Sequence, residues 1–121
     1  MRKRRLEKHL LQTEVAAILG VDRVSVQNWE RGVLEPTIRV IPRIITFLGY
    51  DPEPEPQELP QRLAYARRRL GWRQEDLAHA LAVSLVAIWK WESGRSTPPT
   101  AKLSQFQHLL HRAKLAGITL Q

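Results

Sequence analysis

The 121-residue sequence contains no cysteine, and none of its apolar runs approaches the length needed to span a bilayer. Without thiols there can be no disulfide and no thiolate ligand, so the cores must be held by packing alone, as suits a reducing compartment. The basic start at residues 2–5 is not followed by the apolar segment of a signal peptide. These absences predict a soluble, cytoplasmic protein that does not associate with membranes.

Patterns that carry catalysis or bind cofactors are also missing. No serine or carboxylate pair indicates catalysis, and no glycine-rich loop is present to cradle phosphate. His108 and His111 stand three residues apart, but without cysteine or a nearby acidic cluster they do not predict a metal site. We therefore expect a protein that is not an enzyme and that uses neither metal nor cofactor.

Positive charge is present in two separate blocks. The net charge is +7, although residues 51–58 hold four acids and no base, so residues 1–50 carry +4 and residues 59–121 carry +7. Two positively charged segments favour a polyanionic partner, and nucleic acid is a better candidate than a membrane surface. Charge alone does not decide the matter, because many small basic domains bind no polyanion.

The chain contains an internal repeat. At an offset of 62 positions, residues 12–36 align with residues 74–98 and share nine identities over 25 positions. Within them, Trp-Glu-Arg-Gly at 29–32 returns as Trp-Glu-Ser-Gly at 91–94. Self-similarity at a fixed spacing is the sequence signature of a repeated structural unit, and here it predicts two copies of one small unit.

The boundaries of the two copies follow from composition. Residues 51–58 alternate proline with acids, which predicts an extended polyproline II connector. Two domains are therefore expected, at residues 1–50 and at residues 59–121, the second including a C-terminal tail. Because Leu63 aligns with Met1, the first helix of the first domain is expected to lack its opening turn.

Every segment outside the connector has helical periodicity, so the predicted fold class is all-α, with four to five short helices in each domain. Asp22 and Ser84 are good N-caps for the second helix of a central pair, and Gly32 and Gly94 follow that helix, where a left-handed residue is favoured. A short helix, a tight turn and a second short helix form a helix-turn-helix.

The packing of that motif explains several residue types. A small residue is needed where the helices cross, and both copies have alanine there, Ala16 and Ala78. The turn needs a residue tolerant of positive φ, which Gly20 supplies, whereas Ala82 would cost up to about 1 kcal/mol in the same conformation. The apolar anchors expected to face inward are Val26 and Trp29 in the first copy, and Ile88 and Trp91 in the second.

The runs 11–21 and 29–32, and independently 73–78 and 91–94, resemble the signature of the Cro/CI-like, or xenobiotic-response-element, helix-turn-helix family that includes phage repressors. The resemblance implies two tandem lambda-repressor-like domains and a transcriptional regulator, preferably a repressor, that binds double-stranded DNA sequence-specifically. It also implies that the glutamines Gln12 and Gln74 contact phosphate and brace the reading helix. The ion pairs implied on the same ground are Arg5 with Glu30 and Arg67 with Glu92.

The reading helix of the first copy is expected at residues 22–30. Mapped onto the family, Arg23, Val24 and Asn28 approach base edges, where arginine suits guanine, asparagine suits adenine and valine suits the thymine methyl group. The residues predicted to contact DNA in this copy are Arg2, Lys3, Gln12, Thr13, Arg23, Val24, Ser25, Gln27, Asn28 and Arg31.

The second copy leaves two alternatives open. Leu85, Val86 and Trp89 on its reading helix are apolar, so they can meet thymine methyl groups and sugars or form a protein interface. Its candidate DNA contacts are Gln74, Leu85, Val86, Lys90 and Arg95. We therefore expect it to provide either a second DNA contact or a surface for homodimerisation or another partner.

Two functions from different classes remain at this stage. A DNA-binding regulator, associated with the nucleoid when bound, is favoured by the polar face of the first reading helix. A protein-interaction or antitoxin-like module built on the same fold is favoured by the apolar face of the second.

Overall fold

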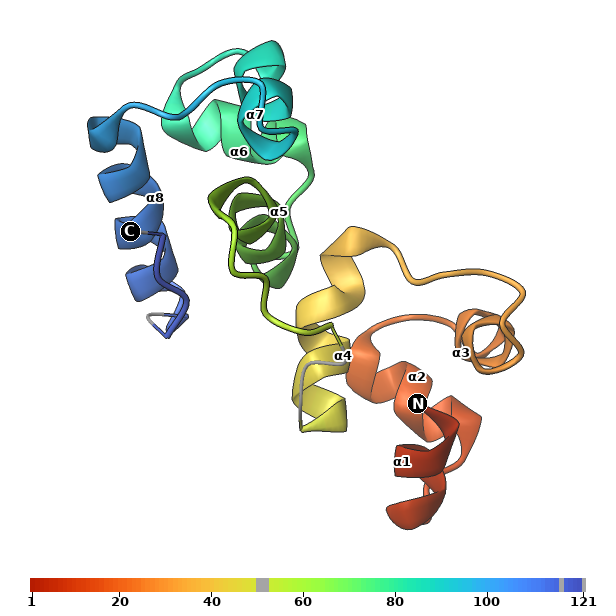
Figure 1. Ribbon diagram of the computed structural model, residues 1–121. Coiled ribbons are helices and arrows are strands. Elements are labelled where there is room, and N and C mark those ends of the chain that lie inside the picture. The colour runs from red at the N-terminus through yellow and green to blue at the C-terminus, as the bar shows by residue number, and fades with distance from the viewer. Residues whose placement is uncertain (50–52, 116, 121) are drawn as a thin grey trace. The chain divides into compact units, whose positions relative to one another are not determined.

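The computed structural model describes residues 1–49, 53–115 and 117–120, and it divides the chain into two compact units, Met1–Glu53 and Pro54–Gln121. Each unit is a bundle of short helices (Figure 1), and no strand occurs in these described ranges, so the all-α prediction is confirmed. We call the two bodies unit one and unit two. Residues 53–58 of the predicted connector contain no helix. Tyr50, Asp51 and Pro52, together with Ala116 and Gln121 of the tail, lie outside the described residues.

Unit one is built on a helix-turn-helix. Its elements are α1 (Arg2–Glu7), α2 (Gln12–Leu19), α3 (Arg23–Glu30), the 3₁₀ helix η1 (Ile38–Val40) and α4 (Ile41–Leu48). Helices α2 and α3 pack against each other, and Val15, Leu19 and Val26 are fully buried between them. Ile44 and Phe47 of α4 complete this core, which fixes the position of α3.

The turn between α2 and α3 follows the sequence-based expectation. Gly20 has a φ of +72°, and the Asp22 carboxylate accepts a hydrogen bond of 2.7 Å from the backbone N–H of Ser25, which caps α3. A Cβ atom on Gly20 would lie 2.7 Å from Nη1 of Arg43, which itself donates to the Leu19 carbonyl at 3.0 Å. Glycine is therefore favoured here by both conformation and space.

Unit two repeats the motif with longer flanking helices. Its elements are α5 (Leu59–Arg69), α6 (Gln74–Leu81), α7 (Leu85–Glu92) and α8 (Thr100–Arg112). Helix α5 has 11 residues where α1 has 6, in line with the short first helix expected from the alignment of Met1 with Leu63. Ser84 caps α7 by accepting a hydrogen bond from the backbone N–H of Ala87.

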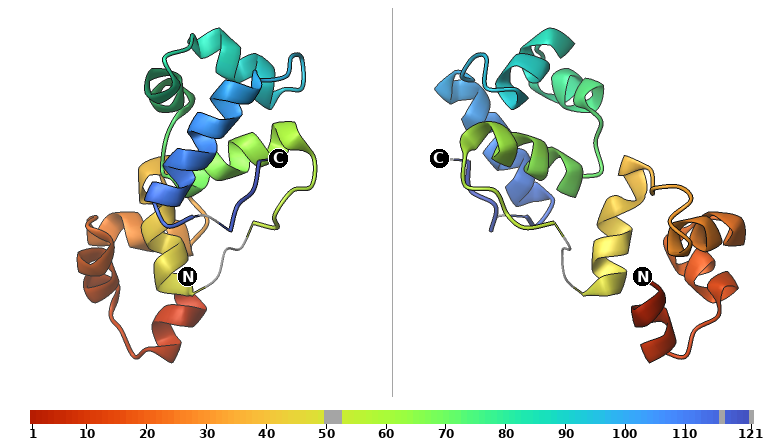
Figure 2. Two further views of the ribbon diagram at one scale, coloured as in Figure 1. Left: turned by 90° about the vertical axis from the view of Figure 1, so that its left-hand side faces the viewer. Right: turned by 45° about the vertical axis from the view of Figure 1, so that its right-hand side comes forward.

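The C-terminal tail is part of the core of unit two, a role that the repeat does not predict. Ile118 and Leu120 are buried in that core. The Gln107 side chain donates to the Ile118 carbonyl at 2.8 Å and accepts from the Leu120 N–H at 2.9 Å, while Arg62 of α5 donates to the Thr119 carbonyl. The path of the tail beside α8 and α5 can be followed in Figure 2. The positions aligned with it fall in the connector, so unit one offers no counterpart.

Ala82 has a φ of +55°, the left-handed conformation of its counterpart Gly20. Lys102 donates to the Leu81 carbonyl at 2.7 Å, which is the role of Arg43 in unit one. We expect Ala82→Gly to stabilise unit two by about 0.5–1 kcal/mol, because glycine removes the steric strain of an L-residue at positive φ. The urea midpoint of unfolding measures this effect.

The matched control is Ala80→Gly, two residues earlier on the exposed side of α6. There the same change should destabilise by about 0.5–1 kcal/mol, since glycine weakens a helix interior. A lowered midpoint for both variants would show that Ala82 is not strained.

Candidate nucleic-acid interface

A buried carboxylate ties together the first three helices of unit one. Glu30 at the end of α3 accepts two hydrogen bonds from Arg5 of α1, at 2.8 and 2.9 Å, and one from the Gln12 amide of α2 at 3.2 Å. Arg5 also donates to the Leu10 carbonyl at 3.1 Å. A bidentate contact between arginine and a carboxylate stabilises the pair and also fixes its orientation. Together with the bond from Gln12, it holds α3 at a defined angle to α2.

The same arrangement recurs in unit two. Arg67 of α5 donates to both Glu92 oxygens at 2.7 and 3.0 Å, Gln74 of α6 donates at 3.0 Å, and Arg67 also donates to the Trp72 carbonyl at 2.9 Å. Both ion pairs and both bracing glutamines that the family resemblance implies are thus present in the structure. We refer to each glutamine–glutamate–arginine set as the brace of its unit.

The brace of unit one lowers the pKa of Glu30, chiefly through the hydrogen bond from Arg5, with a smaller contribution from Gln12 and against the opposing effect of burial. A carboxyl group whose pKa is lower in the folded state stabilises the fold above its ordinary pKa of about 4.3 and loses that contribution as the pH falls through the lowered value. We therefore expect the urea midpoint of unit one to drop between pH 5 and strongly acidic pH, and Glu30→Gln to flatten that drop.

Glu7→Gln serves as the matched control, because the Glu7 side chain is exposed and its ion pair with Arg4 is long, at 3.8 Å. It should leave the acid sensitivity unchanged. An equal flattening in both variants would remove the brace as its cause.

The outward side of α3 presents the predicted reading residues. Arg23 and Val24 are exposed in its first turn, whereas Gln27 and Asn28, one turn later, are half-buried, as is Ser25. Residues four apart share a helix face, so Arg23 lies above Gln27 and Val24 above Asn28. The anchor Val26 is fully buried and Trp29 is partly buried against the same core. The helix therefore turns a mixed polar face to solvent while its anchors face inward.

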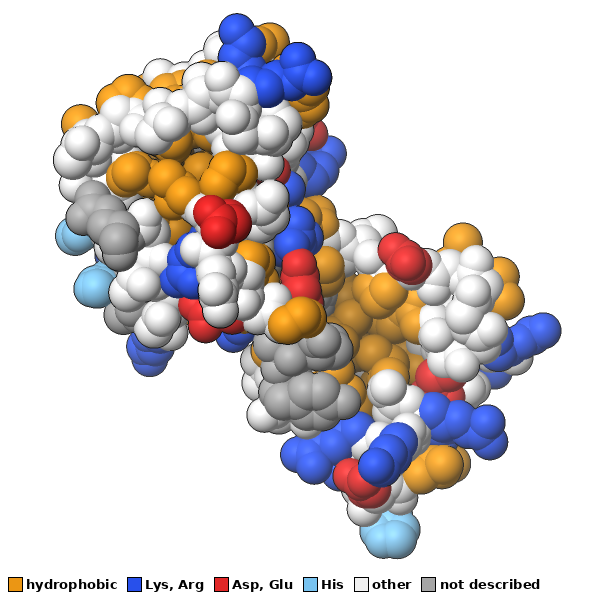
Figure 3. Space-filling view, in the orientation of Figure 1, with side chains coloured by type: hydrophobic (Ala, Val, Ile, Leu, Met, Phe, Trp, Pro, Cys, Tyr) orange, Lys and Arg blue, Asp and Glu red, His pale blue; other side chains and the backbone are white. Residues whose placement is uncertain are grey.

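Unit one also exposes basic side chains outside α3. Arg2 and Lys3 of α1 are exposed, as are Thr13 at the start of α2 and Arg31 just after α3. Figure 3 shows Lys and Arg side chains over α1 and beside α3. Arg4 differs from Arg2 and Lys3, because its Nε donates a hydrogen bond within the unit, to the Phe47 carbonyl at 3.3 Å.

The corresponding face of α7 is apolar. Leu85, Val86 and Trp89 are exposed, with Lys90 beside them, and the guanidinium of Arg95 lies 4.6 Å from the centre of the Trp89 ring. The contact between Arg95 and Trp89 was not predicted, because the two residues belong to different elements.

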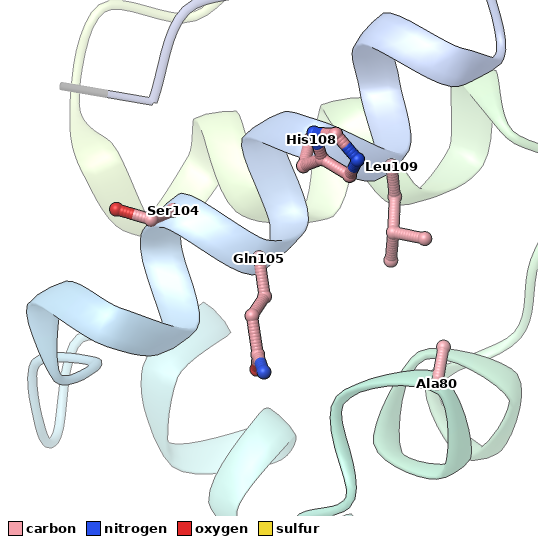
Figure 4. Close-up of a pocket in the computed structure, with 5 residues that line it drawn as sticks. All are labelled: Ala80, Ser104, Gln105, His108 and Leu109. Carbon is pink, nitrogen blue, oxygen red and sulfur yellow. The ribbon is translucent and has the colours of Figure 1, made fainter.

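A separate hollow of about 370 Å³ lies between α6 and α8. Leu109 and Gln105 of α8 and Ala80 of α6 point into it, and Ser104 and His108 lie at its edge (Figure 4). None of these residues belongs to the predicted DNA contacts.

Among the described residues there is no cluster of three or more acidic or histidine side chains suited to a metal ion. In the residues that the structure describes, every helix is too short or too polar to span a bilayer.

The geometry defines a tandem helix-turn-helix protein, in which each motif is braced to the helix before it. The family model described as Helix-turn-helix matches residues 1–54 and, separately, residues 63–111. The chain therefore belongs to this family of Cro/CI-type DNA-binding regulators and contains its domain twice, as the resemblance in the sequence implies. No curated protein and no solved structure matched the chain.

Proposed function

We propose that the protein is a sequence-specific regulator of transcription that places α3 in the major groove of double-stranded DNA. The observation that carries this proposal is the braced α3, whose outward face presents Arg23, Val24 and Asn28 while Val26 is fully buried. A rigid helix with an arginine in its first turn and an asparagine one turn later has the donors needed for guanine and adenine.

Phosphate contacts would set the register of that helix on the duplex. Gln12 at the start of α2 retains acceptor and donor capacity beyond its single bond to Glu30. The exposed Arg2, Lys3, Thr13 and Arg31 supply further donors in the same unit, three of them cationic. Such contacts position a protein on DNA without reading sequence. Repression is the simplest output, because occupying a promoter requires no further contact.

A mobility-shift assay across a salt series tests the proposal. Binding of random duplex should weaken steeply with salt, since cationic side chains release counterions from the duplex. Lys3→Ala should reduce the salt slope by about one unit and weaken all sequences alike. Binding that is indifferent to both salt and Lys3→Ala would overturn the proposal.

The second candidate function is a protein-interaction or antitoxin-like module, and the exposed apolar face of α7 supports it. Exposed apolar patches mark protein interfaces more often than DNA-reading surfaces. Under this alternative unit two would form a homodimer or hold another protein, and Leu85→Ser would abolish that association while leaving DNA binding by unit one unchanged.

A further inference from the structure

Val24 and Val86 occupy the same position in the two units and are both exposed, at 53% and 57%. The other aligned identities are buried or partly buried against the cores, take part in the braces, or are glycine and proline in the loop after the second helix of the motif. A β-branched residue on a solvated helix face gains nothing from packing and slightly weakens the helix. The shared valine therefore calls for a contact outside the chain.

The surroundings of Val86 indicate the chemistry of that contact. Leu85 and Trp89 extend it into an apolar strip, exposed at 50% and 44%, and Lys90 and Arg95 flank the strip. Between residues 85 and 99 the one acid is Glu92, whose carboxylate is held by Arg67 in the brace. An apolar centre with cationic flanks complements a major groove that exposes methyl groups on its floor and phosphates along its edges.

We propose, resting on the proposed function above, that each exposed valine reads the C5 methyl group of a thymine, and that unit two recognises a half-site mainly through thymine methyl groups. Thymine is the one base that places a methyl group in the major groove. Helix α3 adds Arg23 and Asn28 beside its valine, so its half-site also specifies guanine and adenine. On the exposed face of α7, Lys90 and the indole N–H of Trp89 are the donors, and they lie beside the apolar Leu85 and Val86.

Charge favours this occupant over a second copy of the chain. Pairing two α7 faces would gather Lys90 and Arg95 of both copies in one interface, and residues 85–99 supply no uncompensated acid to offset them. Glu75 stands in α6 at the position that Thr13 has in α2. It is paired with Arg73 at 2.8 Å, and because Arg73 also lies 3.6 Å from Asp76, the charge of Glu75 is partly compensated where a phosphate would approach. The face of unit two therefore remains suited to a polyanion.

Deoxyuridine substitution tests the inference directly. Duplexes bound by the whole protein are first selected from a random pool, and thymines of the selected sequence are then replaced by deoxyuridine, one half-site at a time. Each lost methyl group that is in contact should weaken binding about fourfold, from the transfer free energy of a buried carbon group. Val86→Ala should abolish the deoxyuridine effect in one half-site alone, and Val24→Ala in the other alone.

Each variant is thus the matched control of the other, and both positions are exposed, so folding should be little affected. The inference is overturned if a single half-site is selected, if deoxyuridine has no effect in the second half-site, or if Val86→Ala changes self-association in place of base preference. In those outcomes DNA binding through α3 still stands. Absence of any salt-sensitive duplex binding would instead refute the proposed function itself.

Discussion

Replacing Arg67 with methionine is expected to lower the free energy of unfolding of unit two by about 3–5 kcal/mol. Arg67 is 8% exposed and donates to both oxygens of Glu92, whose side chain is also nearly buried. Methionine keeps the apolar packing of the stem but leaves a buried carboxylate without its countercharge, which is the costly way to break such a pair. The Trp72 carbonyl would lose its donor as well.

Urea unfolding followed by tryptophan fluorescence measures this loss. Trp29 is the single tryptophan of unit one, so a Trp29→Phe background confines the signal to Trp72, Trp89 and Trp91 of unit two. Arg112→Met, at an exposed position in the last turn of α8, is the control and should change the free energy by at most about 1 kcal/mol.

A double replacement, Arg67→Met with Glu92→Leu, separates the charge from the geometry. It should recover much of the lost stability, because an apolar pair needs no compensation for desolvated charge. If Arg67→Met alone falls within 1 kcal/mol of the parent, the brace is not what holds α7 in place.

Replacing Arg23 and Asn28 of α3 with alanine should lower the affinity for the preferred duplex by about 10- to 100-fold each. A bidentate contact between such a side chain and a base edge is worth about 1–3 kcal/mol, and 1.4 kcal/mol corresponds to tenfold. Neither side chain is buried, so the effect should fall on recognition and leave stability close to that of the parent.

Competition between the preferred duplex and single-base variants of it measures base preference. Arg23→Ala and Asn28→Ala should each relax the preference at one base pair, while Lys3→Ala should weaken every sequence equally. Base preference that survives in Asn28→Ala would show that a different part of α3 faces the bases.

The internal repeat made the scaffold of each unit predictable. The Asp22 cap, the left-handed Gly20 and the buried Val26 all follow from local rules of turns and helical periodicity. Ala82 at positive φ followed from alignment alone, because its own residue type argues against that conformation.

The rest depended on tertiary contacts that no local pattern encodes. The buried Ile118 and Leu120 are hydrogen-bonded through their backbone to Gln107 of α8, and the positions aligned with them lie in the connector, outside unit one. The stacking of Arg95 on Trp89 joins a loop to a helix. Ser25, Gln27 and Asn28, which periodicity places on the outward side of α3, are partly buried there, and the extent of that burial depends on neighbouring elements.

Methylation interference at guanine N7 tests most directly whether α3 enters the major groove, since N7 lies in that groove. In the selected duplex, methylation of at least one guanine should block binding of the parent protein, and the block at that guanine should disappear in Arg23→Ala. Interference that is absent for the parent, or unchanged by Arg23→Ala, would contradict the placement of this helix against the bases.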